Sequence, residues 1–211
     1  MQPARVPAER KVLQVSATAL ISALILGYVL GSIPFGVILV RMAGAGDLHQ
    51  IGSGGTGATN VLRTGRKGLA AATLLLDLLK GVLVVFLARS FWPGLEAIAG
   101  VAAIVGHCYP IWLRFKGGKG VATLMGVALG LAWPIGAVFA VVWIGVLAIT
   151  RISSVGGMSA AIAAPIAAQI LGYQIYAPAL AAMAVVVLWR HRDNIRRLFA
   201  GKEPRIGRKK G

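Results

Sequence analysis

The sequence has 211 residues, of which 57% are hydrophobic and 13% charged, and its mean hydropathy is +0.79, which excludes an ordinary soluble domain and is typical of a bilayer-embedded chain. A formal net charge of +16 would suggest nucleic acid on a soluble protein, but the Lys and Arg side chains avoid the apolar segments almost entirely, so membrane lipid and an anionic substrate are the expected partners and nucleic acid is not. Cys108 is the only cysteine, which excludes an internal disulfide and a cysteine metal site.

The first apolar segment follows a basic N-terminal extension. Residues 1–15 resemble the start of a signal peptide, yet the apolar run after them is far longer than a signal-peptide core, so we interpret it as a span. A bilayer about 30 Å thick needs roughly 20 helical residues, and residues 17–43 meet this length. Gly31, Pro34 and Gly36 are expected to bend this helix.

A polar loop follows at residues 52–67, with the sequence GSGGTGATNVLRTGRK. Glycines allow backbone N–H groups to converge on an anion, and a hydroxyl such as that of Ser53 adds a further donor. Arg63 can hold two oxygens of an oxyanion at once, and it lies one turn beyond Asn60 if a helix starts there. We therefore expect a phosphorylated ligand here. A solvated connector, the alternative, has no need of Asn and Arg at helical spacing.

Gly52, Gly54 and Gly57 in this loop also spell the G-x-G-x-x-G string of dinucleotide-binding proteins. No strand precedes the string and no βαβ unit can be drawn around it, so we reject a dinucleotide site.

Two further apolar segments, residues 69–88 and 95–113, follow the loop. Asp77 is a carboxylate inside the first segment, and Lys80, one turn on, is its expected partner. An intramembrane carboxylate is a functional candidate, but we interpret this one as part of an ion pair at a helix end near the interface. His107, in the second segment, is interpreted as a packing and hydrogen-bonding side chain.

A second glycine-and-cation loop, RFKGGKG, covers residues 114–120. Gly117, Gly118 and Gly120 surround Lys119, and a helix is expected to begin at about residue 121. The first N–H groups of a helix and its dipole bind anions, so this loop is a second candidate phosphate site. The alternative is a cytoplasmic basic loop with a glycine turn.

The next apolar stretch, residues 121–149, is too long for one crossing, because a single helix would reach about 43 Å. Pro134 divides it into two short helices. With two passes here, the three basic loops and the basic C-terminal tail lie on one side, in agreement with the cytoplasmic preference of Lys and Arg. We therefore predict an all-α membrane protein with the N-terminus out and the C-terminus in. Its seven helical passages are residues 17–43, 69–88, 95–113, 121–132, 135–149, 157–171 and 177–189.

A third polar cluster, RHRDN, lies at the end of the last passage. His191 and Asn194 share a helical face and are expected to point inward, while Arg192 and Arg196 point to lipid headgroups. A basic helix end with an incidental histidine is the alternative. Ser154, which follows the basic turn at Arg151, is expected to add a hydroxyl to the same face.

Absent motifs narrow the chemistry further. The chain has six carboxylates, no H-E-x-x-H and no aspartate pair, so we predict neither a metal nor a cofactor. No histidine is followed by aspartate five positions later, which excludes the H-x4-D motif of one large class of glycerolipid acyltransferases.

The strings GSGGTGATN, FKGGKGVAT and RHRDNI, in this order and with apolar segments between them, resemble the PlsY family of bacterial glycerol-3-phosphate acyltransferases. The resemblance runs from about Gly31 to Gly207. It implies a seven-helix enzyme of the cytoplasmic (inner) membrane, with its active site near the cytoplasmic face. We expect one domain over residues 1–211, with an extension at 1–15 and a basic tail at 203–211.

The implied reaction transfers a fatty acyl group from acyl-phosphate to the 1-hydroxyl of glycerol 3-phosphate, and gives lysophosphatidic acid and phosphate for phospholipid biosynthesis. The soluble enzyme that makes acyl-phosphate is a candidate partner. An acyl-CoA-dependent transferase and a phosphate-ester transporter are the alternatives. A covalent acyl intermediate on Ser53 is disfavoured, because acyl-phosphate is already activated.

The resemblance assigns residues position by position. His191 is expected to act either as a base or as a phosphate ligand. Where the family often has Asn after Gly-Ser-Gly, this chain has Gly55, followed by Thr56. The predicted catalytic residues are Ser53, Arg63, Lys119, His191 and Asn194, and the predicted substrate-binding residues are Gly52, Gly54, Thr59, Asn60, Gly117, Gly118, Gly120 and Ser154.

Overall fold

The computed structural model describes residues 16–52 and 54–206, and every regular element in these two ranges is a helix. The expectations for the extension at residues 1–15, for Ser53 and for the tail beyond residue 206 lie outside the described residues. The α-helices are α1 (Ala17–Gly31), α2 (Phe35–Met42), α3 (Ala58–Leu62), α4 (Lys67–Phe91), α5 (Glu96–Cys108), α6 (Val121–Leu131), α7 (Trp133–Thr150), α8 (Ser153–Ile170), α9 (Ala177–Arg190) and α10 (Arg192–Phe199). Three single 3-10 turns are η1 (Leu48–Gln50), η2 (Ile111–Leu113) and η3 (Gln174–Tyr176).

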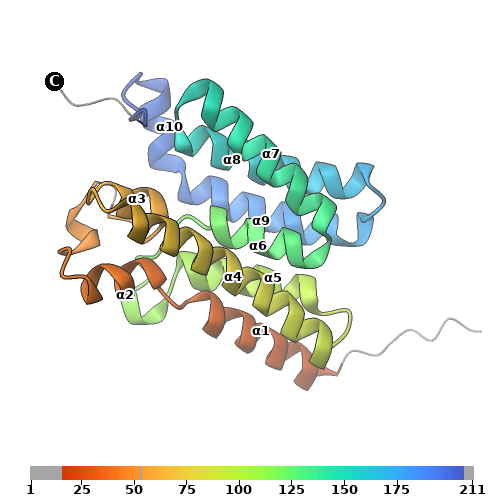
Figure 1. The fold of residues 1–211 in the computed structure, drawn as a ribbon. Helices are drawn as coiled ribbons and strands as arrows, with labels where there is room; N and C mark the ends of the chain where they lie inside the picture. Colours follow the sequence, from red (N-terminus) through yellow and green to blue (C-terminus); the bar gives the residue numbers. More distant parts are fainter. Residues whose placement is uncertain (1–15, 53, 207–211) are drawn as a thin grey trace, which may run out of the picture.

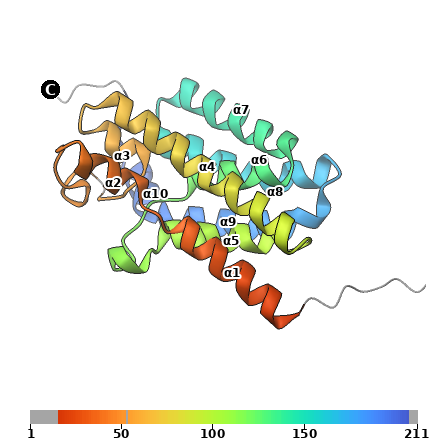
Figure 2. The same ribbon diagram turned by 60° about the horizontal axis from the view of Figure 1, so that its bottom comes forward.

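The longer helices lie side by side and alternate in direction between the two ends of one bundle (Figures 1 and 2). Five described segments are long and apolar enough to cross a membrane. They are Ala17–Met42, Lys67–Phe91, Glu96–Leu113, Trp133–Thr150 and Ser153–Ile170, with shorter apolar helices at Val121–Leu131 and Gln174–Arg190.

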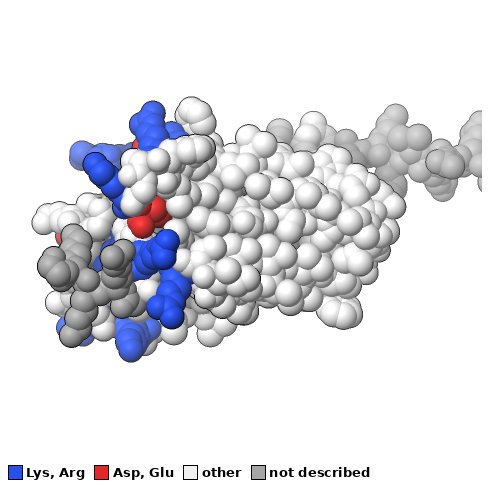
Figure 3. Space-filling view, turned by 90° about the horizontal axis from the view of Figure 1, so that it is seen from above, with Lys and Arg blue, Asp and Glu red and all other residues white. Residues whose placement is uncertain are grey.

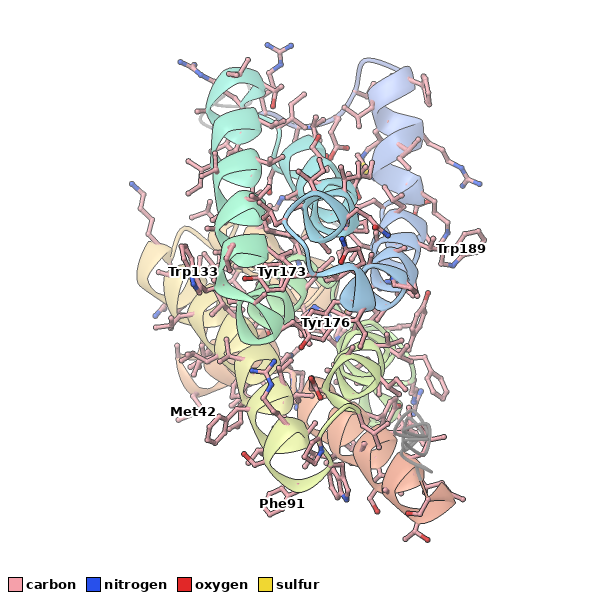
Figure 4. The ribbon with its side chains drawn as sticks, turned by 90° about the vertical axis from the view of Figure 1, so that its right-hand side faces the viewer. Met42, Phe91, Trp133, Tyr173, Tyr176 and Trp189 are labelled. Carbon is pink, nitrogen blue, oxygen red and sulfur yellow. The ribbon has the colours of Figure 1, made fainter. Side chains whose placement is uncertain are left out.

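Large apolar side chains cover the outside of the bundle. Met42, Phe91, Trp133 and Trp189 are all more than 60% exposed, and Figure 4 shows Met42, Phe91 and Trp189 at the periphery. Such a surface would aggregate in water and is suited to lipid, which solvates apolar groups on the outside of a helical bundle.

Small residues line the contacts between helices. A Cβ added to Gly126 of α6 would lie 1.9 Å from the Leu78 carbonyl oxygen of α4, and one added to Gly31 of α1 would lie 2.2 Å from the Ala103 carbonyl oxygen of α5. Only glycine permits these backbone approaches. Close packing through small residues is the usual way in which membrane helices associate.

The first predicted span is broken rather than bent. α1 ends at Gly31 and α2 begins at Phe35, because Pro34 lacks an N–H group and restricts the residue before it. The Trp112 indole N–H donates to the Ser32 carbonyl at 2.7 Å, and the Lys80 ammonium donates to the Ile33 carbonyl at 2.9 Å. These two side chains satisfy carbonyl groups that the break removes from the helix.

The division of residues 121–149 at Pro134 is confirmed. α6 ends at Leu131 and α7 begins at Trp133, so Pro134 lies in the first turn of α7, where its missing N–H group costs no hydrogen bond. The predicted start of the next span at residue 157 was four residues too late, since α8 begins at Ser153. The last span is followed by a separate helix, α10, which we had not predicted.

Lys and Arg side chains gather at one end of the bundle, as Figure 3 shows for one face. We call this end, where α2, α3 and α10 lie, the polar end, and it comprises residues 43–66, 114–120, 151–152 and 190–206. The opposite end, which we call the apolar end, comprises the turns at residues 92–95 and 171–176 and the junction at Ala132. The three polar segments singled out in the sequence therefore meet at one end.

Candidate active site

A pocket of about 300 Å³ opens among the polar segments. Its lining comes from α3, the glycine loop before α6, the start of α8, the junction of α9 and α10, and the tail at residues 203–206, with single side chains or pairs from α4, α5 and α7. Of the predicted site residues, the pocket brings together Thr59, Asn60, Arg63, Gly118, Lys119, Gly120, Ser154, His191 and Asn194. Gly52, Gly54 and Gly117 do not line it, and Ser53 lies outside the described residues.

Helix α3 presents Arg63 to the pocket. The side-chain amide of Asn60 donates to the Leu48 carbonyl at 2.9 Å and accepts a hydrogen bond from Arg63 Nη1 at 3.1 Å. Gly52, which has a φ of 55°, lies against the same guanidinium, and a Cβ there would be 2.2 Å from Nη1. Gly52 therefore shapes the position of Arg63. The one-turn spacing of Asn60 and Arg63 is confirmed, with Arg63 at the end of α3.

Thr59 links α3 to α8, because its hydroxyl lies 3.1 Å from that of Ser153. Two helices far apart in sequence are thereby joined at the rim of the pocket. Gly54, with a φ of 67°, packs near the His49 carbonyl oxygen and does not line the pocket.

In the glycine loop before α6, and contrary to our expectation, the N–H groups of Gly117 and Gly118 do not face the pocket as donors for an anion. The N–H of Gly117 donates to the Cys108 carbonyl at 3.2 Å, and that of Gly118 donates to the His107 carbonyl at 3.0 Å. Both bonds close the end of α5, so these two groups are engaged within the protein. The donors left for an anion lie at the start of α6, where helix geometry leaves the first N–H groups without an intrahelical acceptor. Gly120, with a φ of 85°, makes the turn into that helix.

Arg190 holds the other side of the glycine loop. Its guanidinium donates to the carbonyl oxygens of Gly118 and Gly117, each at 3.1 Å, and lies over the Tyr109 ring. Sequence analysis gave Arg190 no role beyond its place in the RHRDN cluster, because no local sequence pattern indicates its contact with the distant glycine loop.

Lys119 points into the pocket, where its ammonium donates to the Asn194 amide oxygen at 2.6 Å. Burial lowers the pKa of Lys119 to about 8, and the nearby positive charges of Arg197, Arg63 and Arg190 act in the same direction, against the Glu203 carboxylate. Lys119 is mainly protonated at neutral pH and loses its charge in mildly alkaline solution.

His191 and Asn194 are buried and face inward, as predicted, but they do not share one continuous helix. α9 ends at Arg190 and α10 begins at Arg192, so His191 lies at the junction. Nδ1–H of His191 donates to the Val187 carbonyl at 2.8 Å, which leaves Nε2 as the acceptor nitrogen. Burial lowers the pKa of His191 to about 4 despite that bond, and Lys119 adds to the effect, so the ring is neutral at pH 7.

Glu203 is a pocket residue that sequence analysis missed. Its carboxylate accepts hydrogen bonds from the Ser154 hydroxyl at 2.7 Å, the Asn194 amide at 2.5 Å and Arg197 Nε at 2.7 Å. Burial raises the pKa of Glu203, but these three bonds outweigh it and the net shift is downward. The available signal was that Glu203 is the only carboxylate after Asp193 in a strongly basic C-terminal segment.

The floor of the pocket is reached by Asp77 and His107. The predicted pair of Asp77 with Lys80 is confirmed, with 2.7 Å between Oδ1 and Nζ. Its predicted place at a helix end was wrong, because the pair lies in the interior of α4 with both side chains 3% exposed. His107 Nδ1 lies 3.6 Å from the same carboxylate oxygen.

These features define a class: an integral membrane protein of packed apolar helices, with a cationic pocket for an anionic ligand at one end. Comparison with known proteins makes the class specific. The family described as "Glycerol-3-phosphate acyltransferase" matches residues 21–201. The chain is 67% identical over 187 residues to a glycerol-3-phosphate acyltransferase of Novosphingobium aromaticivorans and 58% identical over 187 residues to one of Erythrobacter litoralis, covering 89% of this chain and 95% of the relative in both cases.

A solved structure agrees with the sequence relatives. The crystal structure of PlsY (YgiH), an integral membrane glycerol 3-phosphate acyltransferase, in its glycerol 3-phosphate form matches with a TM-score of 0.85 and 34% identity, over 90% of this chain and 96% of that one. Its lysophosphatidic acid form matches with a TM-score of 0.83 and 33% identity over the same shares. The chain belongs to the glycerol-3-phosphate acyltransferase family that contains PlsY, and it is an integral membrane acyltransferase.

Proposed function

We propose that this protein transfers a fatty acyl group from acyl-phosphate to the 1-hydroxyl of glycerol 3-phosphate, and releases lysophosphatidic acid and inorganic phosphate. The related PlsY has been solved in a glycerol 3-phosphate form and a lysophosphatidic acid form, which are this substrate and this product. Each of the three strings that suggested the family in the sequence contributes residues to the pocket lining, among them Asn60, Lys119 and His191.

One observation supports the proposal most strongly. The two pocket cations for which hydrogen bonds are described, Arg63 and Lys119, are held by amide oxygens, those of Asn60 and Asn194. An amide fixes the position of a cation without carrying a formal charge to neutralise it. Among the described residues neither cation forms an ion pair, so both charges are available to a phosphate group, for which Arg supplies a bidentate fork and Lys a point charge.

In the proposed reaction, the 1-hydroxyl oxygen attacks the carbonyl carbon of acyl-phosphate, a new C–O ester bond forms, and the bond from that carbon to the phosphate oxygen breaks. The departing phosphate takes the bonding electrons and accepts the proton of the hydroxyl. Acyl-phosphate is already activated, so positioning and charge stabilisation supply most of the acceleration. Arg63, Lys119 and the N–H groups at the start of α6 are assigned to the phosphates.

His191 is assigned to the substrate hydroxyl rather than to a phosphate. A neutral imidazole whose Nδ1–H is already bonded to Val187 presents Nε2 as an acceptor, which suits an incoming O–H group. A pKa near 4 makes it a weak base, which agrees with proton transfer to the leaving phosphate. Ser53 is proposed as a hydrogen-bonding residue, and isolation of an acyl-Ser53 enzyme after incubation with donor alone would contradict this.

We further propose that the chain crosses the cytoplasmic membrane seven times, with the N-terminus outside and the polar end in the cytoplasm. The gathering of Lys and Arg at the polar end supports this orientation. A soluble enzyme that makes acyl-phosphate would then meet the pocket from the cytoplasmic side.

The test is an acyl-transfer assay of the purified protein in lipid, with labelled glycerol 3-phosphate and one donor at a time. We expect lysophosphatidic acid with acyl-phosphate and none with acyl-CoA. Product with acyl-CoA alone would favour the other class of transferase. Exchange of labelled glycerol 3-phosphate across vesicles, without acylated product, would favour a transporter.

A further inference from the structure

Beneath the pocket lies a cluster of three titratable side chains that the proposed reaction does not use. Asp77 Oδ1 lies 2.7 Å from Lys80 Nζ and 3.6 Å from His107 Nδ1. The side chains of Asp77, Lys80 and His107 are 3%, 3% and 6% exposed. Asp77 comes from α4 and His107 from α5, and both reach the pocket.

Packing alone gives no reason for these residue types. Charges inside a membrane helix bundle are costly, and a buried ion pair often gives no more stability than apolar side chains of the same volume. A buried ionic cluster in contact with a binding pocket is better explained by what it holds in place.

The cluster contacts the glycine loop through the His107 ring. A Cβ added to Gly118 would lie 2.1 Å from His107 Nε2, and the Gly118 N–H donates to the His107 carbonyl at 3.0 Å. On its other side, Gly118 is held by the Arg190 guanidinium, 3.1 Å from its carbonyl oxygen. Gly118 is therefore fixed between an imidazole ring and a guanidinium group.

The His107 ring is itself anchored to the frame of the protein. Lys80, which pairs with Asp77, also donates to the Ile33 carbonyl at the break between α1 and α2. A carboxylate beside Nδ1 favours the tautomer that carries its proton there and fixes the plane of the ring. A line of contacts thus runs from the α1–α2 break to the backbone of Gly118, whose next residue is Lys119.

We propose that His107, oriented by Asp77, is a positioning residue that holds Gly118 so that Lys119 points into the pocket. The effect on turnover rests on the proposed function, whereas the effect on Lys119 does not. A displacement of about 1 Å in a site of this kind costs up to roughly 100-fold in rate, so a rigid support for the loop has a direct catalytic consequence.

The first arm of the test needs no substrate. The rate at which an amine-acylating reagent labels Lys119 is measured against pH by mass spectrometry, in the intact protein and in His107→Ala, His107→Gln and Gly118→Ala. The charged and polar groups that face Lys119 are the same in all four proteins. They are Arg63 on α3, Arg190 on α9, His191 at the junction, Asn194 and Arg197 on α10, and Glu203 on the tail.

In the intact protein we expect labelling to rise with pH around 8. In His107→Ala the loop relaxes toward solvent, so the rise moves to higher pH. His107→Gln keeps a side-chain donor for Asp77 and should lie between the two. Gly118→Ala keeps all three side chains of the cluster but places a Cβ 2.1 Å from His107 Nε2, so it displaces the same loop. It should shift the rise in the same direction, which tests the proposal even if His107→Ala does not fold. An unchanged Lys119 profile in the folded variants would overturn it.

The second arm measures acyl transfer with the same proteins. We expect kcat/KM for glycerol 3-phosphate to fall by roughly 10- to 100-fold in His107→Ala, mostly through KM, and to recover in part in His107→Gln. Glu96→Gln, in a buried polar cluster at the apolar end, is the matched control and should change neither the Lys119 profile nor KM. Absence of turnover in the intact protein would reject the proposed function and leave the labelling result standing.

Discussion

The two ends of the helical bundle use similar polar residues in opposite ways. At the apolar end, the Glu96 carboxylate accepts from the Gly94 N–H at 2.8 Å and from the Tyr176 hydroxyl at 3.2 Å, and it lies 3.8 Å from Arg89. Figure 4, which looks onto this end, shows Tyr176 near the centre of the end-on view, between the surrounding helices. The polar groups there satisfy one another and close the turn between α4 and α5.

At the polar end, the cations Arg63 and Lys119 are instead oriented by neutral amides and face a pocket. The comparison shows that the type of a residue does not tell whether a charged side chain stabilises the fold or binds a ligand. A charge that is paired with an opposite charge inside the protein stabilises the fold. A charge that forms no ion pair among the described residues is available to bind an anion. Substitutions at the two ends should therefore separate activity from stability.

Removal of Lys119 or Arg63 gives the largest expected effect. Lys119→Ala and Arg63→Ala should each reduce kcat/KM for acyl transfer by about 100- to 1000-fold, because each removes a charge that stabilises the phosphates in the transition state. The melting temperature should change little. Arg196→Ala is the control, since that side chain is 79% exposed and lies outside the pocket. Unaltered activity would remove the substituted residue from the site.

Removal of Glu96, at the apolar end, should lower stability and leave substrate binding unchanged. Glu96→Ala leaves the Gly94 N–H and the Tyr176 hydroxyl without their acceptor, at a cost of about 1–3 kcal/mol in the free energy of unfolding. Thermal or denaturant unfolding in detergent measures this loss. The KM for glycerol 3-phosphate of the folded fraction should be that of the intact protein. A large rise in KM would show that the two ends are coupled.

The pH dependence of kcat/KM sharpens the account of Lys119. The charged form binds phosphate, and it is present below the pKa near 8 and lost above it. We therefore expect kcat/KM for glycerol 3-phosphate to fall up to tenfold per pH unit above about 8. Lys119→Arg should remove this alkaline fall, because guanidinium does not titrate in that range. A fall that persists unchanged in Lys119→Arg would assign it to another group.

The smallest expected effect is that of a single hydroxyl at the apolar end. Tyr176→Phe removes one hydrogen bond to Glu96 while the carboxylate keeps its bond to the Gly94 N–H, so the loss of stability should be about 1 kcal/mol. Unfolding measurements on Tyr176→Phe and Glu96→Ala under the same conditions show how much of the stability loss in Glu96→Ala comes from the tyrosine hydrogen bond. A loss as large as that of Glu96→Ala would mean that the cluster acts as one unit.

Much of the fold could be predicted because membrane helices are specified locally. Length and hydropathy located the spans, and Pro134 marked the division between α6 and α7. The distribution of Lys and Arg predicted that the three polar segments meet. The separate helix α10 was not predicted, because the turn at His191 depends on burial of that side chain against other helices.

The parts of the site that were missed depend on contacts between distant residues. The N–H groups of Gly117 and Gly118 bond the end of α5, and the carboxylate of Glu203 folds back onto Ser154 and Asn194. Neither contact has a sequence period or motif. Likewise, Asp77 and Lys80 were recognised as a pair from their spacing, but their link to His107 and the glycine loop appears only in three dimensions.

The most direct test of the central claim is a structure of this protein with glycerol 3-phosphate bound. The account predicts that the phosphate lies in the pocket at the polar end, within hydrogen-bonding distance of both Arg63 and Lys119. A ligand at the apolar end, or one held by a single polar segment alone, would contradict it.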